Sequence, residues 1–180
     1  MRLFLAIDLP EKIKTKIEKQ IFDLKKQYPH FNWVNKENFH ITLHFFGEVN
    51  DFKKIKEKIE KIIWDQKFFY LYSFNLDVFA NHRLVLYLDF YREKEIEKLA
   101  ETIKKSFAFN PYNQNKFIPH LTLARGPRSS KQQYYTLKNK LNKTKINISF
   151  KIEKIFLYQS ILKEKKPIYK KLAVFSLLDK

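Results

Sequence analysis

The chain has 180 residues, of which 44% are hydrophobic and 31% charged, so it can bury a core and is not a disordered chain. It carries 36 Lys and Arg against 19 Asp and Glu, and the net charge of +17 favours a polyanionic partner over a cationic one. There is no cysteine, which excludes disulfides, thiolate metal sites and a cysteine nucleophile.

No apolar run approaches the roughly 20 residues of a membrane span. The apolar start of the chain is interrupted at Asp8 and Pro10, too soon for a signal peptide, and is typical of a first strand instead. Together with the lack of cysteine, this predicts a cytoplasmic protein without a membrane partner. The lysine-rich composition is also what an AT-biased genome produces, so the charge supports a nucleic-acid partner without identifying one.

The first half of the chain alternates strand and helix patterns. Residues 2–8 predict a short strand, and residues 10–28 carry apolar side chains at helical spacing. A turn-rich piece then leads to a strand over residues 39–46, which Gly47 ends. The second helix that follows has one apolar face, made of Ile55, Ile59, Ile62 and Ile63.

The second half repeats this order of elements. The pattern predicts a strand over residues 83–89 and a helix over residues 93–107. A turn-rich piece over residues 110–115 leads to a strand over residues 117–125, and a weaker helix covers residues 131–142.

The two halves superpose at an offset of about 80 residues, which brings strand 2–8 onto strand 83–89 and His40 onto His120. We interpret this as a duplication about a pseudo-two-fold axis. Further apolar segments, which would complete the sheets, cover residues 67–79, 147–162 and 168–178. The predicted fold is α+β: one domain over residues 1–180 with two pseudo-symmetric lobes, each an antiparallel sheet with outer helices, facing each other across a central groove.

Each half contributes one His-x-Thr-x segment, at residues 40–43 and 120–123. Because side chains alternate along a strand, each histidine shares a face with the threonine two residues later, Thr42 in the first motif and Thr122 in the second. Packing alone does not require two polar side chains inside an apolar strand, twice, at equivalent positions of a repeat. The pattern therefore predicts a site made by both halves.

Two facing imidazoles suit the cleavage of a cyclic phosphodiester. Histidine titrates at about pH 6.5, so His40 and His120 can divide the roles of acid and base at neutral pH. The Thr42 and Thr122 hydroxyls can donate hydrogen bonds to the non-bridging oxygens, whose charge grows in the transition state. Arg125 can add a cation, although strict alternation would point it away from His120.

We expect no metal and no other cofactor, because there is no cysteine and no carboxylate cluster flanks either histidine. His44 shares a face with His40 under strict alternation and is expected at the rim of the groove. A serine nucleophile is disfavoured because the chain has no Gly-x-Ser-x-Gly elbow.

These motifs resemble those of the two-histidine phosphoesterase superfamily, specifically the LigT-like RNA 2′,3′-cyclic phosphodiesterases. The resemblance spans nearly the whole chain and rests on residues 2–10, 33–34, 37–43, 45–47, 119–125, 157–160, 167–169 and 172–177. It implies a metal-independent hydrolase that opens an RNA 2′,3′-cyclic phosphate to the 2′-phosphate. The implied partner is RNA with such an end, for example a tRNA fragment, and no obligatory protein partner.

The resemblance also implies the roles of the site residues. It makes His40 the proton donor and His120 the proton acceptor that activates water, an order that the residues alone do not give. Thr42, Thr122 and Arg125 would hold the cyclic phosphate. The chain departs from the family at His44, commonly Lys, and where Lys163-Glu164-Lys165-Lys166 replaces a turn that often contains Gly.

Aromatic residues make up 17% of the chain, and single-stranded RNA is often bound by stacking of its bases. We expect Phe46 or Tyr158 to stack on the base next to the cyclic phosphate. Two other functions stay open. A 2′-5′ RNA ligase acting on tRNA halves would use the same site, and a non-catalytic module could bind RNA phosphate there, although Lys or Arg would serve binding alone.

Overall fold

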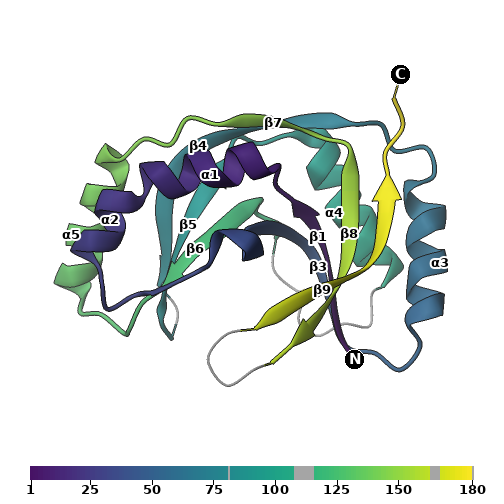
Figure 1. The fold of residues 1–180 in the computed structure, drawn as a ribbon, viewed down its shortest axis with the longest axis horizontal. Coiled ribbons are helices and arrows are strands. Elements are labelled where there is room, and N and C mark those ends of the chain that lie inside the picture. Colours follow the sequence, from purple (N-terminus) through teal and green to yellow (C-terminus); the bar gives the residue numbers. More distant parts are fainter. Residues whose placement is uncertain (81, 108–115, 163–166, 180) are drawn as a thin grey trace.

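The structure, a computed structural model, describes residues 1–80, 82–107, 116–162 and 167–179 (Figure 1). In these residues nine strands form an antiparallel sheet in the order β7-β4-β5-β6-β3-β1-β8-β9, and the short β2 pairs with β6. The strands are β1 (Arg2–Asp8), β2 (Asn32–Trp33), β3 (His40–Glu48), β4 (Phe69–Ala80), β5 (Leu84–Phe90), β6 (His120–Arg125), β7 (Ser149–Ile152), β8 (Lys154–Ile161) and β9 (Ile168–Ser176). The turn predicted over residues 110–115 and the departure at residues 163–166 lie outside the described residues.

Within the described part of the chain, five α-helices and one 3-10 helix connect the strands. They are α1 (Glu11–Gln20), α2 (Phe22–Gln27), η1 (Lys36–Asn38), α3 (Phe52–Ile63), α4 (Lys94–Ser106) and α5 (Lys131–Lys143). In α4, Ile96, Leu99, Ala100 and Ile103 recur at helical spacing and are all buried, and the Glu93 carboxylate caps the helix by accepting the Ile96 N–H at 2.9 Å. None of the described helices combines the length and apolarity that a membrane span requires.

Two predicted segments are divided in the structure. The helix predicted over residues 10–28 is two helices, because Ile21, at φ −92° and ψ 2°, interrupts the helical backbone between α1 and α2. The apolar segment predicted over residues 147–162 is β7 followed by β8. The break at Ile21 does not expose the apolar face, since Ile17, Ile21 and Leu24 are all buried.

Ile41 of β3 pairs with Leu121 of β6, and this pair joins two half-sheets of the same arrangement. On one side the strand order is β3-β1-β8-β9, and on the other it is β6-β5-β4-β7. In each half the strand that carries the His-x-Thr-x motif is innermost. The predicted α+β class with two antiparallel lobes is therefore confirmed, with the difference that the two sheets are halves of one.

Helices α1 and α2 cross to the lobe formed by the second half of the chain. Helix α4, from the second half, crosses to the lobe formed by the first half. After α2 the chain pairs as β2 with β6, and the Phe31 ring lies directly on Gly126. Conversely, Phe107 at the end of α4 packs against His44 and Phe46 of β3. Figure 1 shows α1 and α2 at the same end of the molecule as α5, and α3 and α4 at the other end. This exchange joins the two lobes through one hydrophobic core.

Candidate active site

The first motif strand contains a β-bulge directly after Thr42. The pairing of β3 with β1 skips Leu43, so that Leu43 and His44 are buried one after the other. Phe45 then returns to the face of His40. His44 is 1% exposed and lies against Phe107 and its own neighbours, so its expected position at the rim of the groove is wrong.

The second motif strand has the same bulge. The pairing of β6 with β5 skips Leu123, and Leu123 and Ala124 are buried in succession. Arg125 is consequently exposed on the face of His120, where strict alternation would have turned it away. Its charge adds to the effect of burial in lowering the pKa of both motif histidines, as expected for a guanidinium beside them.

The pairing of Ile41 with Leu121 brings the two motifs together. Because β3 and β6 are antiparallel, this register directs each motif histidine towards the threonine of the other motif. His40 and His120 then occupy diagonal positions, which are about 7–8 Å apart in a regular antiparallel pair. We call the side of the sheet that carries these four side chains the histidine face.

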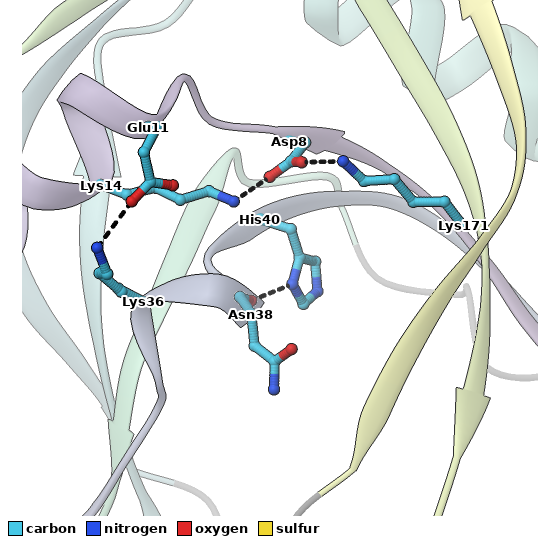
Figure 2. A network of polar contacts seen from close by, with 7 residues as sticks. All are labelled: Asp8, Glu11, Lys14, Lys36, Asn38, His40 and Lys171. Carbon is cyan, nitrogen blue, oxygen red and sulfur yellow. Dashed lines mark hydrogen bonds and ion pairs between the residues drawn. The ribbon is translucent and has the colours of Figure 1, made fainter.

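Both histidines are oriented by the same local hydrogen bond. The Nδ1 atom of His40 lies 2.7 Å from the carbonyl oxygen of Asn38, and that of His120 lies 2.8 Å from the carbonyl oxygen of Ile118. A carbonyl oxygen only accepts, so each Nδ1 carries the hydrogen and donates it. The Nε2 atom of each neutral ring is therefore a free acceptor. Figure 2 shows the His40 ring turned towards the carbonyl group of Asn38.

Asp8 lies opposite His40 in the pairing of β1 with β3. Its carboxylate is held at 2.6 Å by Lys14 and at 2.6 Å by Lys171, as Figure 2 shows. Burial acts to raise the pKa of Asp8, but the hydrogen bonds from the two lysines outweigh it and the pKa is lowered. A fixed negative charge therefore stands beside His40.

Comparison with known proteins gives the family. Residues 13–163 match the model of the 2′-5′ RNA ligase superfamily. The chain belongs to this superfamily. It is 33% identical to a protein of Methanocaldococcus jannaschii over 94% of this chain and 96% of that protein. It is 30% identical to a protein of Thermotoga maritima over 94% of this chain and 92% of that one. Both relatives are named RNA 2′,3′-cyclic phosphodiesterase.

Solved structures show the same fold. The protein TT0787 of Thermus thermophilus superposes with a TM-score of 0.79 at 24% identity, over 98% of both chains. Escherichia coli LigT complexed with phosphate superposes with a TM-score of 0.71 at 25% identity, over 99% of this chain and 98% of LigT. The LigT-like resemblance of the motifs is therefore confirmed.

In this member of the superfamily, burial is the largest influence on the charge of both motif histidines. It lowers the pKa of His40 to about 4 and also lowers the pKa of His120. The charge of Asp8 opposes the shift at His40, whereas His120 and Arg125 add to it. Both rings are therefore neutral at neutral pH, and a bound anion is needed to favour the protonated form of one of them.

Asp89 is the counterpart of Asp8 in the second half. It lies opposite His120 in the pairing of β5 with β6, and its charge acts to raise the pKa of His120. Burial raises the pKa of Asp89 itself, and no ion pair to it is found among the described residues. Sequence reasoning missed both aspartates. Their signal was their place at the ends of the equivalent strands 2–8 and 83–89.

An aromatic cluster flanks His40 on the histidine face. The Phe4 ring stacks on Tyr158, with centroids 5.2 Å apart, and lies 5.1 Å from the His40 ring. Tyr169 meets His40 edge to face at 5.1 Å. Phe45, 47% exposed, contacts Phe4 at 5.9 Å. Tyr158, predicted for this site, lies 6.4 Å from the His40 ring but is itself buried.

Phe46, the other predicted stacking residue, lies elsewhere. Its ring packs 4.7 Å from His44 and 4.9 Å from Phe107, on the side of the sheet opposite the histidine face. The bulge at Leu43 is the physical reason, because it turns Phe45 rather than Phe46 towards His40.

The second half surrounds its histidine differently. The His120 ring meets Phe79 at 5.4 Å and Tyr87 at 5.6 Å, both edge to face, and Phe79 stacks on Tyr87 at 4.0 Å. These contacts support the ring from the side. In the residues that the structure describes, no three His, Cys, Asp or Glu side chains gather to hold a metal ion.

Proposed function

We propose that this protein hydrolyses RNA 2′,3′-cyclic phosphate ends to 2′-phosphomonoesters, with His40 and His120 as the acid–base pair. The observation that carries this proposal is the matched Nδ1 hydrogen bond, which leaves Nε2 of both rings free on two strands that meet at Ile41 and Leu121. The names of the M. jannaschii and T. maritima relatives support the substrate. We treat residues 1–180 as one catalytic domain, since each half supplies one histidine.

The reaction is an in-line displacement at phosphorus. Nε2 of His120 accepts a proton from water as the water oxygen bonds to phosphorus. The bond from phosphorus to the 3′ oxygen breaks, and Nε2 of His40 donates its proton to that oxygen. The phosphate then remains on the 2′ oxygen. The order of the two roles follows the family resemblance, and the cyclic phosphate anion favours the protonated form of His40 on binding.

Thr42, Thr122 and Arg125 hold the non-bridging oxygens in this proposal. The two hydroxyls donate hydrogen bonds, and the guanidinium supplies a fixed positive charge whose contribution grows with the charge of the transition state. The nucleobase lies on the aromatic cluster beside His40, where Phe45 and Tyr169 are the accessible rings and Tyr158 stacks on Phe4.

The description of the matching family model points to 2′-5′ RNA ligation as a second candidate. In that reaction the 5′-hydroxyl of another RNA, such as a tRNA half, replaces water as the nucleophile, and the same 3′ oxygen leaves. His120 and His40 would keep their roles. Hydrolysis and ligation therefore differ in the nucleophile that enters the site, not in the catalytic side chains.

The test uses the purified protein in EDTA with a nucleoside 2′,3′-cyclic phosphate and with an oligonucleotide that ends in one. We expect the 2′-phosphate alone, resolved from the 3′-phosphate by chromatography. Formation of the 3′-phosphate, or loss of activity in the chelator, would overturn the mechanism. Longer RNA formed from two tRNA halves would establish ligation, and RNA binding without turnover would favour a non-catalytic module.

A further inference from the structure

A hollow lies apart from the four motif side chains, where the end of the β4–β5 hairpin meets the start of α5. Its volume is about 540 Å³. Arg83 lines it from the hairpin, Arg128 from the segment after β6, and Lys131, Tyr134 and Tyr135 from α5. None of the described residues that line it is acidic. We call this hollow the cationic pocket.

The three cations of the cationic pocket are free to meet an outside anion. Arg83, Arg128 and Lys131 are exposed, and in the described part of the chain none of them forms an ion pair. Arg128 is positioned by a 3.2 Å hydrogen bond from its Nε to the carbonyl oxygen of His82. By contrast Lys138, further along α5, is neutralised by Asp77 at 3.2 Å.

The positive character of the pocket comes from these side chains and not from the end of the helix. Ser130 and Gln133 form a capping box, in which the Ser130 hydroxyl accepts the Gln133 N–H at 3.2 Å and the Gln133 side chain accepts the Ser130 N–H at 2.9 Å. The capping box thus satisfies N–H groups of the first turn within the protein.

The cationic pocket lies next to the end of β6, just beyond Arg125 of the candidate active site. Arg125 pairs with Val85, and the next backbone contacts join Gly126 to Leu84 and Leu84 to Pro127. Arg83 directly precedes β5, and Val85 and Tyr87, the residue that supports His120, share one face of that strand. From His120 to Pro127 an extended chain spans about 20 Å. A molecule held at both places must therefore be longer than one nucleotide.

We propose that the cationic pocket binds the sugar–phosphate backbone of single-stranded RNA upstream of its cyclic end. This inference rests on the proposed function and adds a second contact for the same substrate. Arg83, Arg128 and Lys131 meet phosphate oxygens, and Tyr135, 52% exposed, offers a ring on which a base can stack. The protein then distinguishes an RNA end from a free cyclic mononucleotide by length.

The test compares a cyclic mononucleotide with an eight-nucleotide RNA that ends in a 2′,3′-cyclic phosphate. In the triple variant Arg83→Gln, Arg128→Gln, Lys131→Gln, we expect KM for the RNA to rise about tenfold, because three phosphate contacts are lost. The slope of log(kcat/KM) for the RNA against log salt should fall by about 2. Both kinetic constants for the mononucleotide should stay at the wild-type value.

The matched control removes the same charge at the other end of the molecule. Lys53→Gln, Lys61→Gln, Lys98→Gln neutralises three exposed lysines of α3 and α4, and Figure 1 shows these helices far from α5. The control should leave KM for the RNA unchanged. Circular dichroism and thermal unfolding establish that both triple variants are folded.

The outcomes separate the inference from the proposed function. An equal rise of KM in the control, a wild-type KM in the pocket variant, or a matching loss with the mononucleotide would each overturn the pocket as an RNA site. Failure of the wild-type protein to hydrolyse either substrate would instead overturn the proposed function.

Discussion

Arg125 and Phe45 occupy the same position in the two halves of the sheet. Each follows a bulge directly after the motif threonine, and each emerges on the face that carries the histidines. This equivalent position therefore holds a cation on one side of the Ile41–Leu121 pair and an aromatic ring on the other. We infer that the cyclic phosphate lies towards Arg125 and the nucleobase towards Phe45.

Replacing Arg125 removes the cation that this arrangement directs at the phosphate. We expect Arg125→Ala to lower kcat/KM for a cyclic nucleotide about 100-fold, and Arg125→Lys to restore part of it. Phe45→Ala is the matched control, because it should raise KM and leave kcat within about threefold. Steady-state kinetics of the three variants checks this, and wild-type activity of Arg125→Ala would disprove the role.

The pH dependence should follow the buried histidines. Because burial lowers the pKa of both His40 and His120, the optimum of kcat/KM should lie on the acid side of pH 6.5. Asp8 acts to raise the pKa of His40, so Asp8→Asn should move one limb of the profile to still lower pH. Glu11→Gln removes an exposed carboxylate bound to Lys36 and should not move it. A shift to higher pH in Asp8→Asn would contradict this electrostatic account.

His44 should make the stability of the protein depend on pH. Burial lowers its pKa from 6.5 to about 4. Between these values the unfolded chain binds a proton that the folded chain does not, so stability falls as pH falls through the window. His44→Phe should reduce this slope by one proton, about 1.4 kcal/mol per pH unit. Urea unfolding at several pH values measures the slope.

Phe46→Leu is the control for that measurement. It removes a ring next to His44 without changing the number of titratable groups, so its cost should be the same at every pH. An unchanged slope in His44→Phe would show that His44 does not titrate as its burial predicts.

Gly126 lies where the chain from α2 crosses to the second lobe, and we expect that a larger residue does not fit there. A Cβ added there would lie 2.6 Å from the Phe31 ring, which is buried. We expect Gly126→Ala to destabilise the fold by about 1–3 kcal/mol through overpacking. Phe31→Leu in the same chain should recover part of this loss. Thermal unfolding of the two single variants and the double variant forms the cycle, and additive losses would show that the two positions are not coupled.

Much of the fold followed from local patterns. The apolar spacing in α4 and the apolar strands around residues 2–8 and 83–89 predict the order of the elements, because α4 is buried on one face and the two continuously apolar strands are buried over most of their length. The repeated order then indicated two similar antiparallel lobes. The exchange of helices between the lobes was not predictable, because the pattern of α1 is the same whichever sheet covers it.

The bulges explain what the sequence left uncertain at the site. A bulge adds one residue to a strand and reverses the alternation of side chains beyond it. Nothing in the local sequence at Leu43 or Leu123 indicates that a bulge forms there. For this reason strict alternation places His44 and Phe46 on the wrong side of the sheet, and it would turn Arg125 away from His120. His40 and His120 precede the bulges, and their positions needed only the strand pattern.

The most direct measurement is the turnover of His40→Asn and His120→Asn on a nucleoside 2′,3′-cyclic phosphate, with binding of the product followed by calorimetry. We predict that each variant binds the nucleotide and loses at least about 100-fold in kcat, because each lacks one of the two proton transfers. Wild-type turnover in either variant would contradict the histidine pair as the catalytic centre.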